Sequence, residues 1–223
     1  MDVQELEAKV KTLENEISTL RDKVITLEDT DQIKELQRIY GYYLDNLMYD
    51  EVIDLFSDST ESLEISSIGI FTGKEGVRKF FNNMKANALR KPDNVRGLSL
   101  HMMLQGVVHL DPGGKTARGR WQCFMCLNLA AAGEPSAAWG HGAFENEYVK
   151  ENGKWMFRKL RVFISFQSPY EDGWLKTPFL GRTLTAPVRS DIADKPFTEG
   201  NAYLGYASGW VIPFHYKHPI TGK

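Results

Sequence analysis

The sequence predicts an α+β fold: a cone-shaped, curved antiparallel sheet with helices in its concave face, preceded by an N-terminal coiled-coil helix. Helical patterns fill the first part of the chain, and four long alternating segments joined by tight turns follow them. Because long antiparallel strands coil strongly, we expect the sheet to curl around the helices and leave a conical cavity at one end. The chain then divides into a coiled-coil helix over 1–28, an α+β barrel over 29–168 and an extension over 169–223.

Residues 1–28 carry an unbroken heptad repeat, with β-branched residues at every a position and leucine at every d position. The repeat consists of Val3, Leu6, Val10, Leu13, Ile17, Leu20, Val24 and Leu27. Positions g and e carry opposite charges, as a parallel coiled coil in register requires: Lys9 with Glu14, Glu16 with Arg21, and Lys23 with Glu28. We expect a homo-oligomer, although one amphipathic helix lying on its own domain would show a similar stripe.

The barrel begins with helical patterns that alternate with short polar segments. Asp29, Thr30 and Asp31 have the side chains of helix N-caps, so a second helix is expected over 31–45. Two further helices and a strand between them are expected before the sheet, over 50–56, 74–88 and 63–71 respectively.

The second half of the chain changes to strand periodicity. The expected strands, separated by Gly-containing turns, cover 98–110, 115–130, 137–150 and 154–168. The segment 169–223 has no clear period but is rich in aromatic residues, which indicates an ordered extension that wraps the body.

Composition excludes several classes of function. Hydrophobic residues make up 42% and charged residues 25% of the chain, and the net charge is −2, as in an ordinary soluble domain. Without a basic stripe or a run of 18 apolar residues, neither nucleic acid nor membrane is an expected partner. Cys123 and Cys126 should point to opposite faces of one strand as small buried thiols, and a reducing cytoplasm suits them. The acidic N-terminus lacks the pattern of a secretory signal.

Several short sequences, taken together and in order, resemble the SnoaL-like family of the nuclear-transport-factor-2-like superfamily. They are IleLysGluLeuGlnArgIleTyr at 33–40, LeuAsp at 44–45, TyrAspGlu at 49–51, PheThrGlyLysGluGlyVal at 71–77, GlyArgTrp at 119–121, GlyAlaPhe at 142–144 and GluTyrValLysGluAsnGlyLysTrp at 147–155. The resemblance implies a cone-shaped barrel with an internal acid–base site and no cofactor. It also favours a trimer over a dimer, whereas β-branched residues at a positions and leucine at d positions favour a coiled coil of two helices.

The resemblance extends to candidate catalytic residues. Tyr40, Asp45 and His101 match active residues of the bile-acid dehydratases in this family. Tyr40 and Asp45 are about 140° apart around a helix, so Asp45 must be redirected inward at the helix end. A phenol, a carboxylate and an imidazole can together move protons near neutral pH. From the residues alone, Tyr40 and His101 are equally typical of a packed core, and Asp45 of a helix end.

Two departures from the dehydratase pattern indicate a more apolar substrate. Met125 replaces a carboxylate, and Ile164 replaces an arginine if no gap intervenes. We expect the remaining substrate contacts from Met125, His141, Tyr43 and Arg78, with His141 as a replacement proton carrier, although a surface histidine near a turn is the commoner case. His215 and His218 have short metal-ligand spacing, but without a nearby carboxylate or cysteine no metal site is expected.

These residues, with the resemblance, predict a cofactor-independent lyase for a hydroxylated aromatic small molecule. Lyases of the same superfamily remove formaldehyde from lignin-derived diarylpropane diols, and dehydration followed by C–C cleavage of such a diol in aromatic catabolism would suit the site. The alternatives are an isomerase, a polyketide-type cyclase or an epoxide hydrolase in the same cavity, and a non-catalytic ligand-binding protein.

Overall fold

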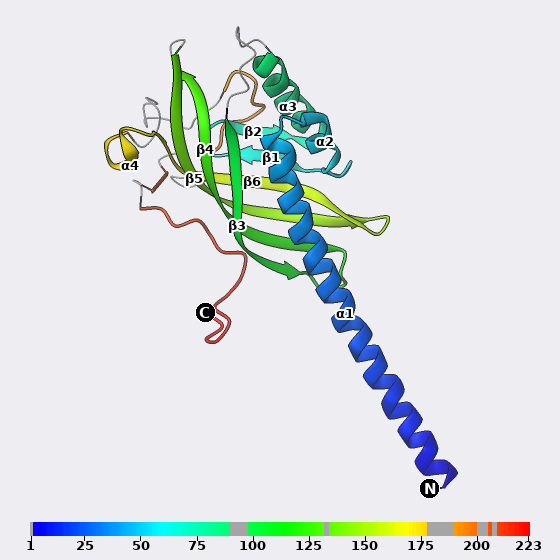
Figure 1. Cartoon of the computed structure of the whole chain (residues 1–223). Coiled ribbons are helices and arrows are strands. Elements are labelled where there is room, and N and C mark those ends of the chain that lie inside the picture. Colours follow the sequence, from blue (N-terminus) through cyan, green and yellow to red (C-terminus); the bar gives the residue numbers. More distant parts are fainter. Residues whose placement is uncertain (1, 90–97, 132–133, 178–189, 200–204, 207–208) are drawn as a thin grey trace.

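In the computed structural model, one six-stranded sheet curls around the C-terminal part of a long helix (Figure 1). The strands lie in the order β2-β1-β6-β5-β4-β3. Their bounds are β1 Ser62–Ile65, β2 Gly69–Thr72, β3 Ser99–Leu110, β4 Thr116–Ala131, β5 Glu134–Glu151 and β6 Lys154–Pro169. The structure describes residues 2–89, 98–131, 134–177, 190–199, 205–206 and 209–223.

The sheet is mixed rather than wholly antiparallel, and it does not close into a barrel. Strands β3 to β6 form the expected antiparallel meander, but β1 pairs in parallel with β6. The single strand expected over 63–71 is wrong, because the chain reverses there and makes the antiparallel hairpin β1–β2. Gly69, with a φ of 135°, adopts at this reversal a backbone conformation that residues with a side chain rarely reach.

The helix α1 runs without a break from Val3 to Asp45, so the expected interruption at residues 29–31 is wrong. Asp29 does not cap a helix. It is 2% exposed, and its Oδ1 accepts hydrogen bonds from Lys150 Nζ at 2.6 Å and Trp155 Nε1 at 2.9 Å. Asp29, which the sequence suggested as a helix N-cap, therefore lies within α1, and its carboxylate attaches the helix to the sheet.

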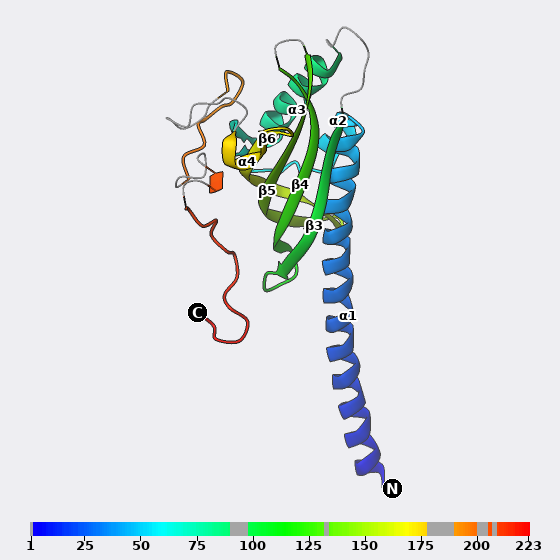
Figure 2. The ribbon, with the colours of Figure 1, turned by 60° about the vertical axis from the view of Figure 1, so that its left-hand side comes forward.

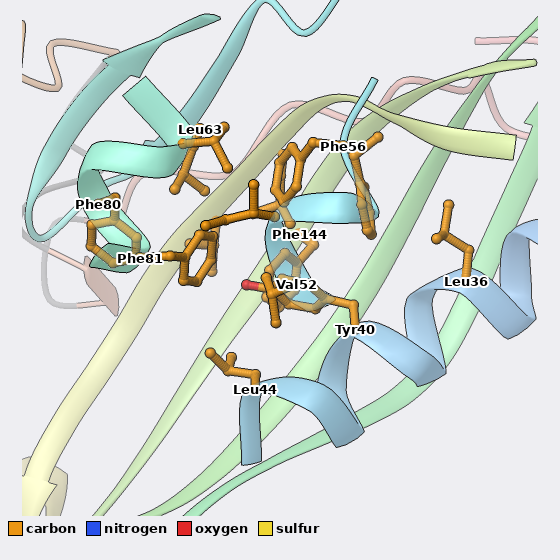
Figure 3. Packing of buried hydrophobic residues seen from close by; sticks show 14 of the residues in the cluster. Leu36, Tyr40, Leu44, Val52, Phe56, Leu63, Phe80, Phe81 and Phe144 are labelled. Carbon is orange, nitrogen blue, oxygen red and sulfur yellow. The ribbon is translucent and has the colours of Figure 1, made fainter. Parts of the chain in front are cut away.

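The described residues also contain three shorter helices: α2 Tyr49–Asp54, α3 Gly73–Leu89 and α4 Gly173–Lys176. The core lies between the concave face of the sheet and α1, α2 and α3. Figure 3 shows aromatic and aliphatic side chains of this cluster, among them Tyr40, Phe81 and Phe144, pointing toward one another. None of the helices in the described ranges combines the length and apolar character that crossing a membrane would require.

Strand alternation separates the two faces of the sheet. On β4, Trp121, Cys123 and Met125 are buried in the concave face, whereas the intervening Gln122 and Phe124 belong to the convex face. Described parts of the C-terminal extension pack against the convex face, on the side of the sheet opposite α1 (Figure 2). There Phe197 and Trp210 contact Phe163 of β6, with ring centroids 5.6 and 5.5 Å away.

Candidate acid–base site

The end of α1 determines where its last carboxylate points. Asp45 is the final helical residue, and the chain then closes through hydrogen bonds from Leu47 N to Leu44 O and from Met48 N to Tyr43 O. This pattern needs a left-handed residue, here Leu47 with a φ of 59°. A negative charge at a helix C-terminus is electrostatically unfavourable, so Asp45 requires compensating hydrogen bonds from elsewhere.

His101 on β3 supplies both of those hydrogen bonds. Its backbone N–H donates to Asp45 Oδ1 at 2.8 Å, and its ring Nδ1 lies 3.0 Å from the same oxygen. The two side chains are 16% and 17% exposed, so the pair is largely buried and still reachable from solvent. A carboxylate bonded to Nδ1 fixes the orientation of the ring and leaves Nε2 available for a proton transfer.

Tyr40 lies five residues before Asp45 on the same helix and is 5% exposed. Its ring meets Phe144 and Phe157 edge-on, with centroids 6.3 and 5.5 Å away. Within the described ranges, its hydroxyl has no hydrogen-bond partner. Burial, followed by the nearby Cys123 and Asp45, raises the pKa of Tyr40 well above its ordinary value, so the phenol stays protonated.

The paired strands β3 and β4 provide the inward-facing side chains next to Asp45, His101 and Tyr40. Register places His101 opposite Met125 and Met103 opposite Cys123, and both β4 residues face inward. Burial and the charge of Asp45 raise the pKa of Cys123 to about 12, so this cysteine is a neutral thiol at physiological pH. Asp45 thus hydrogen-bonds to His101, and its charge raises the pKa of both Tyr40 and Cys123.

The register continues from Met125 to Gly140 on β5 and then to Gln167 on β6, which forms one row across the concave face. A Cβ at Gly140 would lie 3.1 Å from both Met125 Cε and Gln167 Cγ. Gln167 is half-buried and, among the described residues, its amide has no hydrogen-bond partner. Sequence reasoning missed Cys123 and Gln167, because only the strand register shows that they share a face with His101.

Three other expected site residues have different surroundings. His141 pairs with Phe124 on the convex face, where it lies 3.0 Å from Ser165 Oγ and stacks on Phe166. Its assignment to the internal site is wrong, since Met125 and His141 belong to opposite faces of the sheet. Arg78 is also outside the site, with a 46% exposed side chain that pairs with Glu75 on α3. Tyr43 packs half-buried against the core.

Among the residues that the structure describes, no group of three histidine, cysteine, aspartate or glutamate side chains is arranged to hold a metal ion. His218 accepts hydrogen bonds from the backbone N–H groups of Ile220 and Thr221.

A model of the SnoaL-like domain matches residues 26–161. The chain belongs to the SnoaL-like domain family. This match contains α1 from just before Asp29 and most of the meander, and it includes Tyr40, Asp45 and His101. The match confirms the resemblance drawn from the sequence.

Solved structures with the same fold include a candidate scytalone dehydratase of Novosphingobium aromaticivorans, 16% identical, with a TM-score of 0.56, covering 72% of this chain and 99% of its own. The hexachlorocyclohexane dehydrochlorinase LinA-type3 of Novosphingobium barchaimii is likewise 16% identical, with a TM-score of 0.55, covering 74% and 99% of the two chains. At these identities the likeness shows the fold alone. No curated protein matches the sequence.

Proposed function

We propose that this SnoaL-like protein is a cofactor-independent lyase that eliminates water from a hydroxylated aromatic substrate by general acid–base catalysis. The observation that carries the proposal is the carboxylate of Asp45, which holds His101 by two hydrogen bonds and lies five residues along α1 from the buried Tyr40, whose pKa it helps to raise. An oriented imidazole and a protonated phenol beside one charge supply a base and an acid. Two fold neighbours, described as a scytalone dehydratase and a hexachlorocyclohexane dehydrochlorinase, support an elimination.

Each group has a distinct role in this proposal. Asp45 orients His101 and stabilises its protonated ring, and His101 Nε2 removes a proton from the substrate. Tyr40, whose raised pKa keeps it protonated, donates a hydrogen bond or its proton to the leaving hydroxyl. Met125 and the neighbouring aromatic rings provide apolar surface for an aryl group, and the neutral Cys123 contributes no nucleophile.

A diarylpropane-1,3-diol with a para-phenol on the carbinol side is the substrate that we propose. Loss of its phenolic proton and of the benzylic hydroxyl, which leaves as water, gives a quinone methide. The terminal hydroxyl then loses its proton, and the C–C bond to that carbon breaks and releases formaldehyde. The electron pair of that bond forms the new C=C bond and restores the phenol. The products are a stilbene, water and formaldehyde, with no external oxidant or reductant.

The test is a product analysis with chelator-treated, full-length protein and such a diol. We expect a stilbene, detected by absorbance and mass, together with one equivalent of formaldehyde. His101→Ala and Asp45→Asn should each lower kcat about 10²-fold or more, the range expected for general acid–base groups. His141→Ala is the matched control, because the same histidine loss on the convex face should leave kcat unchanged.

Two results would refute the proposal. The first is a protein that leaves the diol and simpler para-hydroxybenzylic alcohols unconverted. The second is conversion at an unchanged rate by folded His101→Ala protein. A product of unchanged mass would instead identify an isomerase in the same site, and a gain of water would identify a hydrolase.

A further inference from the structure

Residues 3–28 of α1 expose a continuous apolar stripe. The eight heptad side chains from Val3 to Leu27 are 47% to 71% exposed, and this part of α1 extends away from the rest of the molecule (Figure 1). Isolated exposed apolar residues are ordinary on protein surfaces, but a contiguous stripe indicates a surface for interaction. The stripe therefore requires an occupant that its own subunit does not provide.

The phase of the helix excludes the subunit's own sheet as that occupant. Successive residues of an α-helix are turned by about 100°, so Val24 and Leu27 lie roughly 160° and 140° around α1 from Tyr40, which is on the side of the helix that packs into the core. Because α1 continues through Asp29 without a break, this relation is fixed. The amphipathic helix lying on its own domain, the alternative left open by the sequence, does not occur.

The charges beside the stripe indicate what the occupant is. Within the described chain, the g and e residues of the repeat, from Lys9 to Glu28, form no ion pair with any other residue. Each g residue has a complementary e residue five positions later, and this spacing brings opposite charges together only between parallel helices in register. A second copy of the same helix satisfies the apolar stripe and these charges at once.

We propose that Val3–Glu28 forms a parallel, in-register coiled coil between copies of this chain. Because the seam faces away from the core side of α1, the bodies radiate outward from a central bundle. The proposal concerns assembly alone and is independent of the proposed reaction. The β-branched a and leucine d positions are those that favour a pair of helices, whereas the family resemblance favours three.

Light scattering after gel filtration of the full chain tests the assembly. We expect a mass of two or three chains for the wild type and of one chain for Leu13→Lys/Leu20→Lys, which places charge at two d positions. Ala8→Lys/Asn15→Lys is the matched control, because it adds the same charge at f positions, on the outside of the coil. A monomeric wild type, or a double d-position variant that keeps the wild-type mass, would overturn the proposal.

A cysteine at one end of the repeat tests whether the helices are parallel. In a parallel pair, Leu6→Cys meets its own copy and should form a disulfide-linked dimer under mild oxidation. In an antiparallel pair, residue 6 faces the region of Leu27 and lies about 30 Å from its copy. Wild-type protein controls for the native Cys123 and Cys126. An oligomer without this cross-link would overturn the parallel arrangement.

Discussion

The hydroxyl of Tyr40, which has no hydrogen-bond partner among the described residues, has a different energetic role from the hydroxyl of Tyr148, another buried tyrosine of the core. Tyr148 is 0% exposed, and its hydroxyl donates to Gln37 Oε1 at 2.9 Å and accepts from Trp121 Nε1 at 2.9 Å. A buried hydroxyl with partners stabilises a fold, whereas one without partners contributes nothing or destabilises. Proteins keep such groups where function needs them.

Substituting each tyrosine with phenylalanine separates the two roles. We expect Tyr148→Phe to lower the free energy of unfolding by about 1–3 kcal/mol, because Trp121 and Gln37 lose a buried partner. Tyr40→Phe should change it by less than about 0.5 kcal/mol, because no hydrogen bond within the described protein is lost. Urea unfolding followed by tryptophan fluorescence, at one protein concentration, measures both. A loss of stability in Tyr40→Phe equal to that in Tyr148→Phe would contradict this account.

Gln167 provides a residue-scale test of the proposed substrate position. It ends the row that begins at His101, and its free amide faces the same surface as Met125. Gln167→Leu keeps the size of the side chain but removes its hydrogen-bonding group, so we expect KM for the diol to rise about 5- to 30-fold with a smaller change in kcat. Gln105→Leu, at an exposed position on β3, is the control. An unchanged KM would exclude Gln167 from substrate binding.

The sequence could predict Tyr40, Asp45 and His101 as site residues, because residue type, spacing and family pattern can all be recognised in the sequence alone. The face of the sheet to which a strand residue points cannot be recognised in this way. His141 was assigned to the wrong face because the phase of a strand depends on its register with its neighbours, and β5 and β6 shift register at His141 and Gly142. The catalytic role of the nominated residues stays a prediction until the variants are assayed.

At the scale of elements, the attachment of α1 to the sheet depends on Asp29. Its carboxylate is nearly fully buried and holds Lys150 and Trp155 together. Asp29→Ala leaves a lysine and an indole without this partner, and we expect the free energy of unfolding to fall by about 2–4 kcal/mol, since breaking a buried pair costs more than an exposed one. Asp31→Ala, at an exposed position two residues later, should change it by less than about 0.5 kcal/mol. If chemical unfolding showed the same loss of free energy of unfolding for both substitutions, the proposed attachment of α1 through Asp29 would be refuted.

The same residue explains why the boundary of the first helix was predicted wrongly. Aspartate and threonine are typical of both N-caps and surface positions within helices, and local sequence cannot distinguish them. The role of Asp29 is determined by its hydrogen bonds to Lys150 and Trp155, which lie more than 100 positions away in the sequence. The positions of the turns in the meander, by contrast, were predictable because Gly113, Gly114 and Gly153 adopt the positive φ that such turns require.

The C-terminal extension is held to the convex face by a chain of polar contacts. His215 Nδ1 lies 2.9 Å from Glu145 Oε2, and His215 Nε2 lies 3.0 Å from His109 Nδ1. Glu145 also pairs with Arg120, whose guanidinium covers the ring of Phe214. A contact between two imidazoles needs one neutral nitrogen as acceptor, so its strength depends on pH.

We expect this attachment to weaken on acidification. Burial, and then the charges of His215 and Arg118, lower the pKa of His109 below its ordinary value. Because the pKa of His109 is lower when the extension is attached, His109 binds fewer protons in the attached state than in the released state. Its stabilisation of the attached extension is therefore fully present above pH 6.5 and is lost as the pH falls below this value. Amide exchange of 209–216, corrected for its intrinsic pH dependence, should quicken between about pH 7 and 5.5. His109→Asn should flatten this dependence, and a wild-type profile without any change would contradict it.

At the scale of the whole molecule, α1 joins two functions that the structure keeps separate. Its first part carries the proposed coiled-coil seam, and its last turns carry Tyr40 and Asp45. The two hydrogen bonds between Asp45 and His101 are made within one subunit, and the side chains of residues 2–28 are exposed and form no part of the core. Assembly should therefore fix where the sites lie relative to one another without completing any of them.

This separation predicts that a monomeric protein is active. In Leu13→Lys/Leu20→Lys, we expect kcat per chain to stay within about twofold of the wild type, because the hydrogen bonds between Asp45 and His101 lie within the subunit. The melting temperature of the wild type should rise with protein concentration, as mass action requires for an oligomer, and that of the variant should not. If kcat fell more than tenfold in this variant but not in Ala8→Lys/Asn15→Lys, a neighbouring subunit would have to contribute to the site.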